Sequence, residues 1–269
     1  MPSLVSEVQH LLRIWRATVR AGFIREMEFR ANFYSGLLRQ GLWLATFIFL
    51  IEVIFRNTQA LAGWNKPEVL VVLALSRLLE GTIDAVFSRN IARFPEKVRT
   101  GAFDFYLTRP VPAQFAIAFE RFNFLNLGNV VTGIVLLGYA LAIGSATPSL
   151  SAWLLFTLLA VLGITIYYCL LLTFASLVFF FERLEALVAI SHLFSEPLTV
   201  PFDVFPRDIR ILLTYLLPLA FVVFVPAQTL TGKLQWWYVP TGLAIASFLL
   251  VVANVVWRTG LKKYTSASS

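Results

Sequence analysis

Runs of about 20 mostly apolar residues recur along the chain, long enough for helices that cross the hydrocarbon core of a bilayer. Of the 269 residues, 58% are hydrophobic and only 14% are charged, which is more apolar surface than a soluble fold of this size can bury. Within lipid the backbone must satisfy its own hydrogen bonds, so helices are the natural choice. We therefore predict an all-α integral membrane protein with six transmembrane helices, at residues 37–56, 68–88, 115–143, 153–181, 184–204 and 236–257.

Residues 209–230 allow two arrangements, because this apolar segment contains Pro218 and Pro226. A full crossing gives seven spans, with the chain ends on opposite sides. A segment that enters and returns gives six spans, with both ends in the cytoplasm. Lysine and arginine concentrate on cytoplasmic segments, and six spans place most of the 22 basic residues on one side. We predict re-entrant helices at 209–230, on the extracellular side of one membrane domain that covers residues 37–269 of a cell (inner) membrane protein.

Residues 1–36 form a separate amphipathic unit before the first span. Apolar residues recur there at helical spacing, while Arg13, Arg16 and Arg20 share another face. A basic stripe opposite an apolar face suits a helix that lies among lipid head groups. A surface helix of a soluble domain has the same pattern, but the sequence offers no soluble domain for it to cover.

The interval 89–112 is the longest polar stretch between two predicted spans, and we call it the 89–112 loop. Its basic residues outnumber Glu96 and Asp104, which predicts a cytoplasmic position. Pro95 is suited to starting a short helix and Gly101 to stopping it. A second short segment then has an apolar side, and it ends at Pro110 and at the next proline. This pattern predicts a folded surface that another protein can contact.

No constellation of catalytic or metal-binding residues stands out. The two histidines are far apart, and a zinc site needs more ligands. The segment Thr231–Leu234 lacks the earlier glycine and the following Ser or Thr of a phosphate-binding loop. We therefore expect no catalytic residue, metal or cofactor in this chain. The net charge of +7 is better explained by cytoplasmic loops than by nucleic acid, so no nucleic acid partner is expected.

Three charged residues lie inside the second predicted span. Arg77, Glu80 and Asp84 stand at positions i, i+3 and i+7, so they share one helix face. Charges within a span face a bundle interior or a water-filled space. They either line a substrate path, or form a pairing surface for another subunit, or consist of an Arg77–Glu80 pair that neutralises itself.

Two further carboxylates allow alternatives of the same kind. Glu52 lies near the outer end of the first span, where it either meets a cationic substrate or pairs with Lys66 or Arg56. Glu196 follows His192 by four residues in the fifth predicted span, so both lie on one helix face.

Four stretches carry a resemblance to a known family: FRANFYSGLLRQGLWLATFIFLIEVIF at 29–55, LAGW at 61–64, RTGAFDFYLTRPV at 99–111 and LPLAFVVFVPAQTLTG at 217–232. Together they resemble permease subunits of the ABC-2 exporter superfamily, with the viologen-exporter-like group as the nearest match. The most specific element combines Arg99, Gly101, Asp104, Leu107 and Pro110.

The resemblance implies properties that composition does not. Such permeases have six spans after an amphipathic connecting helix, and they assemble with a second permease, homologous or identical, and with two copies of an ABC ATPase. ATP and Mg²⁺ bind to that ATPase. The loop between spans two and three holds a coupling helix that contacts the ATPase, and by position this is the 89–112 loop. The expected contact residues are Arg93, Lys97, Arg99, Gly101, Phe103, Asp104, Phe105 and Arg109, with Tyr106 beside the two phenylalanines; Asp104 can instead cap a short helix.

These observations predict the membrane subunit of an ATP-driven exporter for an amphipathic or hydrophobic compound. Glu52, Glu80 and Asp84 favour a cationic one. The alternative is a proton-coupled secondary transporter with Glu52, Asp84 or Glu196 as relay, although the chain has no inverted repeat of the kind common in such folds. A third hypothesis, that the protein is an enzyme acting on lipid, has little support, because the sequence shows no convincing nucleophile, metal cluster or paired carboxylates.

Overall fold

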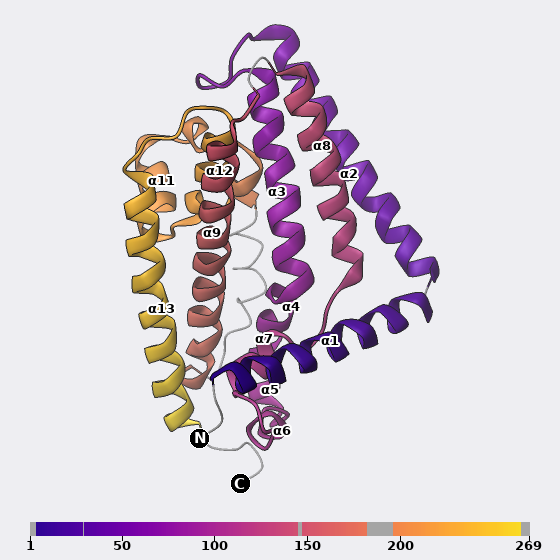
Figure 1. Ribbon diagram of the computed structural model, residues 1–269, viewed down its shortest axis with the longest axis vertical. Coiled ribbons are helices and arrows are strands. Elements are labelled where there is room, and N and C mark those ends of the chain that lie inside the picture. The colour runs from indigo at the N-terminus through magenta and orange to yellow at the C-terminus, as the bar shows by residue number, and fades with distance from the viewer. Residues whose placement is uncertain (1–3, 29, 145–146, 182–195, 265–269) are drawn as a thin grey trace.

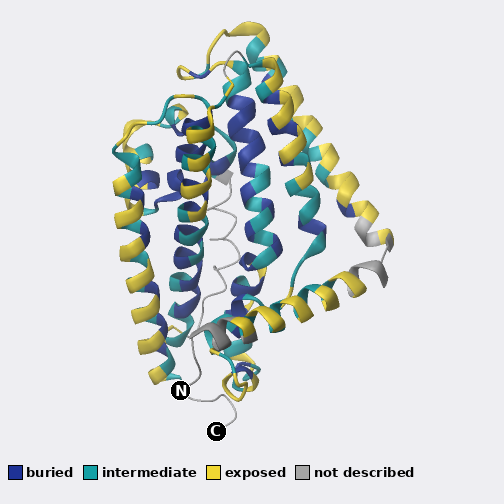
Figure 2. Cartoon of the chain, in the orientation of Figure 1, coloured by how far each residue is buried: buried dark blue, intermediate teal, exposed yellow. Residues whose placement is uncertain are grey.

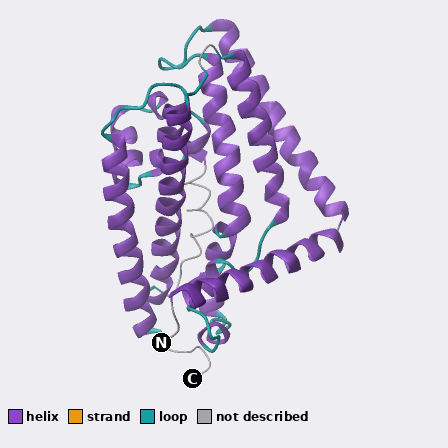
Figure 3. Cartoon of the chain, viewed as in Figure 1, coloured by secondary structure: helices purple, strands orange, loops and turns teal. Residues whose placement is uncertain are grey.

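The computed structural model describes residues 4–28, 30–144, 147–181 and 196–264 (Figure 1). Over this part of the chain the regular elements are helices, as Figure 3 shows, which confirms the all-α prediction there. The longer helices are α1 (Leu4–Glu28), α2 (Arg30–Asn57), α3 (Lys66–Val86), α8 (Leu127–Ile143), α9 (Leu150–Ser176) and α13 (Tyr238–Lys263). The shorter ones are α4 (Ser88–Ala92), α5 (Phe94–Arg99), α6 (Asp104–Leu107), α7 (Ala113–Ala118), α11 (Arg207–Ile211) and α12 (Phe224–Leu230), with 3-10 turns η1 (Phe124–Asn126) and η2 (Leu177–Phe179).

Four described segments are long and apolar enough to cross a membrane: 34–57, 124–143, 150–179 and 238–263. A fifth candidate is a bent pair, 207–216 with 219–230, whose halves meet at 75°. α3 has the length of a span but carries five charged residues: Lys66 and Glu68 in its first turn, and Arg77, Glu80 and Asp84 further along. The protein is therefore a multi-pass membrane protein.

α3 is the most enclosed of these helices, as the dark blue of Figure 2 shows. Its start is fixed by a capping box: the Asn65 side chain accepts from the Glu68 N–H at 3.0 Å, and Glu68 Oε2 accepts from the Asn65 N–H at 2.8 Å. α8 lies close along α3, because a Cβ at Gly133 would stand only 2.6 Å from the Leu78 nitrogen. Small residues allow helix backbones to approach in this way within membranes.

A second group of helices forms around α9. α12 and the turn before it pack against α9, and every residue from Pro218 to Leu230 is buried. A Cβ at Gly163 would stand 2.3 Å from the Phe221 carbonyl oxygen, so this glycine lets the broken segment reach the helix. The segment's irregular backbone is thus covered by protein, as a membrane setting requires.

The third predicted span begins later than expected. Residues 115–123 do not continue α8; they form most of α7 and a bend, and the span runs from Phe124 to Ile143. Asn90 supports the break, because its side-chain amide donates to the carbonyls of Ala118 at 2.9 Å and Arg121 at 2.8 Å. The charged pair Glu120–Arg121 at the bend explains why a continuous apolar helix does not form there.

Most of the fifth predicted span, 184–204, lies outside the described residues. Its described end consists of two 3-10 turns, Glu196–Thr199 and Phe202–Val204. The last predicted span is α13, which continues to Lys263.

α1 lies across the lower end of the molecule, at the same end as α5, α6 and the last turn of α13 (Figure 1). It packs on the bend before α8: the Phe23 and Phe124 ring centroids are 5.4 Å apart, and those of Trp15 and Phe122 are 6.4 Å apart. Arg16 and Arg20 are exposed on another face of the helix. An amphipathic helix is therefore present over Leu4–Glu28, whereas residues 30–36 form the start of α2.

Candidate functional site

The 89–112 loop folds into short helices that extend from the lower end of the bundle (Figure 1). Pro95 occupies the first turn of α5, where its missing N–H is harmless. Gly101 follows the helix with φ of +73°, a left-handed conformation that glycine adopts without strain. The Phe103 N–H then donates to the Lys97 carbonyl at 3.0 Å. The predicted stop at Gly101 is confirmed.

The inner side of the loop is held by an aromatic cluster, which we define as Phe94, Phe103, Phe179, Trp257 and Tyr264. Phe103 lies within 5.1 Å of Tyr264, 5.2 Å of Phe94 and 5.8 Å of Phe179, measured between ring centroids. Phe94 lies 5.2 Å from Trp257. Because Phe179 ends the α9 span and Trp257 is on α13, the cluster joins the loop to two distant helices.

The aromatic cluster corrects one expectation. Phe103 is fully buried and Tyr106 nearly so, whereas both were expected to contact another protein. The rings of Phe179, Trp257 and Tyr264 surround Phe103, while the Tyr106 hydroxyl accepts a hydrogen bond from Lys97. Phe105 is 72% exposed and is the ring that remains available.

Asp104 holds the loop to the end of the chain's last described helix. Its carboxylate accepts a hydrogen bond from the Tyr264 hydroxyl at 2.9 Å. Partial burial and this carboxylate raise the pKa of Tyr264 to about 12. Phe103 occupies the cap position of α6, with no side-chain hydrogen bond there, and Asp104 is the first residue of the helix.

Lys97 is directed into the loop rather than out of it. Its ammonium group donates to the Tyr106 hydroxyl and to Glu120, and its side chain is only 16% exposed. Burial by itself raises the pKa of Glu120, but the hydrogen bond and charge of Lys97 outweigh it, so the pKa of this carboxyl is lowered. Lys97 therefore fixes the loop against the bend before α8.

The outer side of the loop is basic and carries one large apolar ring. Arg93, Arg99, Phe105 and Arg109 are exposed. Arg99 is bound to Glu96 at 2.7 Å, and the Arg109 guanidinium lies 4.7 Å from the centre of the Tyr106 ring. Cation–π contact of this kind limits the positions that an arginine samples. We call these four residues the outer face.

The intramembrane charges of α3 are brought together with polar side chains of other helices. Arg77 pairs with Glu80 at 3.5 Å, donates to Asn129 at 3.4 Å, and stacks 3.5 Å from the centre of the Trp43 ring. The expected Arg77–Glu80 pair is present, so the two charges neutralise each other. Asp84 follows one turn later and is partly buried.

Glu52 forms an ion pair with Lys66 at the outer end of α2, one of its two expected arrangements. Glu196 begins a 3-10 turn, but its side chain lies outside the described part of the structure, as does His192. Lys66 is the first residue of α3, so Glu52 pairs with the start of that helix and not with the Arg77–Glu80 pair.

Sequence reasoning did not single out a second polar network at the upper end. The Trp64 indole N–H donates to Asp203 at 2.9 Å, and Arg210 binds the same carboxylate at 2.8 Å. Lys233 donates to Glu68 at 2.6 Å. The prominent tryptophan of the LAGW element was a signal, but its partner lies 139 residues away, so no local pattern could reveal it.

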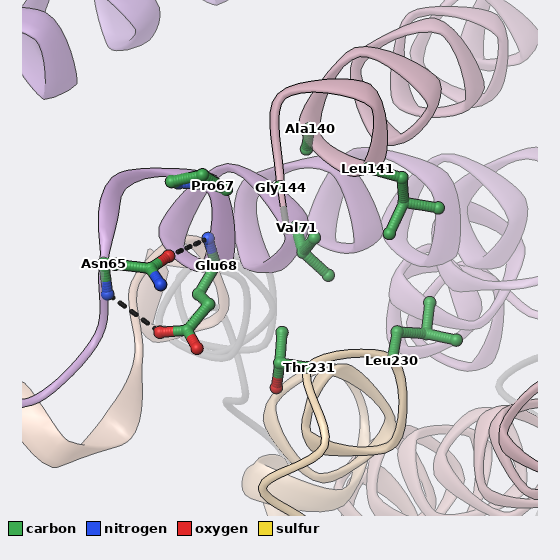
Figure 4. A pocket seen from close by; sticks show the side chains of 9 residues that line it. All are labelled: Asn65, Pro67, Glu68, Val71, Ala140, Leu141, Gly144, Leu230 and Thr231. Atoms are coloured by element: carbon green, nitrogen blue, oxygen red, sulfur yellow. Dashed lines mark hydrogen bonds between the residues drawn. The ribbon is translucent and has the colours of Figure 1, made fainter. Parts of the chain in front are cut away.

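A small pocket of about 50 Å³ lies beside this network, where α3, the end of α8 and the end of α12 meet (Figure 4). Its lining combines the capping pair Asn65 and Glu68 with apolar side chains such as Val71, Leu141 and Leu230. Among the described residues, no group of three or more metal-ligating side chains occurs.

Comparisons with known proteins agree with this architecture. The model of the family described as "ABC-2 family transporter protein" matches residues 42–268, which leaves α1 outside the match. Searches of curated proteins and of solved structures gave no match. The matched region contains α3, the 89–112 loop, the broken segment around Pro218, and α13. Because the match covers most of the chain, this protein belongs to the ABC-2 family of transporter proteins.

Proposed function

We propose that this membrane protein is the permease subunit of an ATP-driven ABC exporter, and that the outer face of the 89–112 loop binds a separate ATPase subunit. One observation carries the proposal: an exposed basic and aromatic face is backed by the buried aromatic cluster. A face of this composition suits an acidic groove with an apolar floor. The aromatic cluster behind this face is tightly packed, which suits transmission of a movement from the loop to the membrane helices.

In this scheme the two ATPase subunits close around ATP and Mg²⁺ and displace the loop. Phe103 and Phe94 are packed on Phe179 and Trp257, so the displacement reaches α9 and α13. α3 receives it through the short connection of α4. A second permease, identical or homologous, completes the path, and substrate leaves on the side opposite the loop.

The proposed topology has six spans, with residues 207–230 entering and leaving on the extracellular side. The 75° bend of this segment and its burial against α9 support a return rather than a crossing. α1 then lies at the cytoplasmic surface of the inner membrane, and both chain ends are cytoplasmic. Its exposed arginines suit contact with anionic lipid.

The proposed cargo is an amphipathic or hydrophobic compound. The described spans offer aromatic and aliphatic side chains and few charges. Glu52 is paired with Lys66, and Glu80 with Arg77, so neither provides an unpaired anion for a permanent cation.

The test is the double variant Arg99→Ala with Phe105→Ala, compared with Arg207→Ala with Trp236→Ala, which removes an exposed arginine and an exposed aromatic ring elsewhere. We expect the first variant to insert normally but to lose copurifying ATPase and substrate-stimulated ATP hydrolysis, while the second keeps both. Normal substrate-stimulated ATP hydrolysis in the first variant would contradict the proposal. Export that stops when the proton gradient collapses, with ATP still present, would point to the proton-coupled alternative instead.

A further inference from the structure

Polar side chains from three helices meet inside the membrane part of the protein, beneath α2. We define the polar cluster as Gln40, Trp43, Arg77, Glu80, Asn126 and Asn129. Arg77 is its centre, through its contacts with Trp43, Glu80 and Asn129. Gln40 lies one turn before Trp43 on α2 and donates to the Leu125 carbonyl at 2.9 Å. The cluster thus spans the contact between α2, α3 and α8.

Gly81 brings the two asparagines against α3. A Cβ at this position would lie 2.8 Å from the Asn129 Cβ and 3.1 Å from the Asn126 carbonyl oxygen. Any larger residue would push the start of α8 away from Arg77 and Glu80. The asparagine Asn126 also accepts from Arg89 at 3.2 Å, so the polar contacts continue toward the lower end of the bundle.

Four atoms of the polar cluster are buried and have no hydrogen-bond partner: Gln40 Oε1, Arg77 Nε, Glu80 Oε1 and Asn126 Nδ2. Asn126 as a whole is only 2% exposed. Inside a membrane each unsatisfied group costs several kcal/mol, since lipid offers no replacement partner. The cluster therefore presents two donors and two acceptors that a bound molecule can satisfy.

α2 covers the polar cluster and is the least buried of the long helices around it. Between Tyr34 and Asn57 only Gly36 and Ile51 are buried, and the closest packing of α2 is at its start, where Gly36 lies against Leu125 and Gln40 against Gly128. Trp43 lies directly over the Arg77 guanidinium. Displacement of α2 would uncover the polar cluster while leaving the tightly packed contact between α3 and α8 intact.

The charges of the polar cluster indicate what it would take. Arg77 pairs with Glu80, and the two charged residues beside the cluster, Asp84 and Arg89, are also of opposite sign, so the region has no formal net charge to attract an ion. The cluster offers both hydrogen-bond donors and hydrogen-bond acceptors. A head group that is neutral or zwitterionic fits this arrangement better than a permanent cation does.

We propose that the polar cluster binds the hydrogen-bonding head group of an amphipathic molecule without net charge, which enters when α2 moves away from α3 and α8. That this molecule is also the transported one rests on the proposed function. Binding of the head group needs no ATPase, so an experiment can disprove this proposal without disproving the proposed function, and the reverse.

The experiment uses the full chain in lipid vesicles without ATPase, in a Cys169→Ser background that removes the single native thiol. Thr132→Cys is the reporter, because it lies one turn from Asn129 on α8 and is partly buried. The probe is 2-(trimethylammonium)ethyl methanethiosulfonate, which needs water to reach a thiol. Leu75→Cys is the control for a dry core, and Val135→Cys the control for a lipid-facing position.

We expect the thiol at position 132 to react about tenfold faster than those at 75 and 135, which corresponds to about 1.4 kcal/mol less free energy to bring the thiol into contact with water. Dodecylphosphocholine, below its micellar concentration, should slow the reaction more than dodecyltrimethylammonium, which has the same tail but a net charge. Equal protection by the two, or no reaction above the controls, would overturn the proposal.

Two further variants separate binding from simple loosening of the fold. Trp43→Ala should speed the reaction at position 132 and Trp43→Phe should restore the slower rate, because the ring covers Arg77. Arg77→Gln removes the guanidinium, and the buried Glu80 carboxyl then takes up a proton, so protection by dodecylphosphocholine should weaken and its preference over the trimethylammonium compound should be lost. An unchanged preference in Arg77→Gln, with a normal melting temperature, contradicts the assignment of the site to this cluster.

Discussion

Phe103 and Phe105 stand two residues apart in the 89–112 loop and have opposite environments. The first is fully buried in the aromatic cluster, and the second is 72% exposed on the outer face. The difference arises because α6 turns one side toward the ends of α9 and α13, where Phe179 and Tyr264 receive the Phe103 ring. One side chain therefore supports the loop, while the other is free to contact a second protein.

The same substitution at these two positions should separate stability from binding. Phe103→Ala removes a buried ring and leaves a cavity, so the purified chain should lose about 3–5 kcal/mol of unfolding free energy. Phe105→Ala should stay within about 0.5 kcal/mol, as exposed substitutions do. Thermal unfolding in detergent, followed by tryptophan fluorescence, measures both. Similar losses in the two variants would show that the loop does not pack as described.

At the scale of elements, the contact between α3 and α8 depends on glycine in the middle of a helix. A Cβ at Gly133 would lie 2.6 Å from the Leu78 nitrogen and 2.8 Å from the Ala74 carbonyl oxygen, both of which are backbone atoms. Backbone of a packed helix cannot shift as a flexible side chain can. Gly138 lies on the same helix with no atom within 4 Å of its added Cβ.

Gly133→Ala and Gly138→Ala form a matched pair for this contact. Gly133→Ala should destabilise the chain by about 1–3 kcal/mol through overpacking. Gly138→Ala should be neutral or stabilise the helix by up to about 1 kcal/mol, because alanine restricts the unfolded chain. The shift in melting temperature distinguishes them. A neutral Gly133→Ala would mean that the two helices are further apart than described.

At the scale of the whole molecule, α1, the 89–112 loop and the last turn of α13 lie at one end, and the start of α3 lies at the other (Figure 1). Trp64 immediately precedes α3, and residues at the start of α3 line the pocket. This arrangement follows from the course of the helices. It agrees with an even number of crossings between the loop and the end of α13, which the charge distribution alone also favours.

Labelling of single cysteines in closed cells tests this arrangement. In the Cys169→Ser background, thiols at Arg16→Cys, Phe105→Cys and Lys262→Cys should be protected from an impermeant reagent until the membrane is opened. A thiol at Trp236→Cys should react at once, because that residue is 81% exposed at the opposite end. Labelling of the 262 thiol, but not of the 105 thiol, in closed cells would require an odd number of crossings between them.

The sequence by itself determined the class of the protein, because apolar runs of membrane-spanning length leave few alternatives to helices. It also predicted the stop at Gly101 and offered the Arg77–Glu80 pair as one of three alternatives, since both depend on residues close in the chain. The predicted start of the third span, at residue 115, was wrong. Asn90 and the Glu120–Arg121 bend stabilise a break in the helix there, and hydropathy does not detect such a break.

Only the tertiary structure decided which residues of the 89–112 loop face outward. Phe103 and Lys97 are turned inward by Tyr264 and Glu120, and neither partner is recognisable from local spacing. The polar cluster and the Trp64 network likewise join residues from helices far apart in the chain. Burial depends on which surfaces pack together in the folded protein, so it cannot be read from the neighbours of a residue along the sequence.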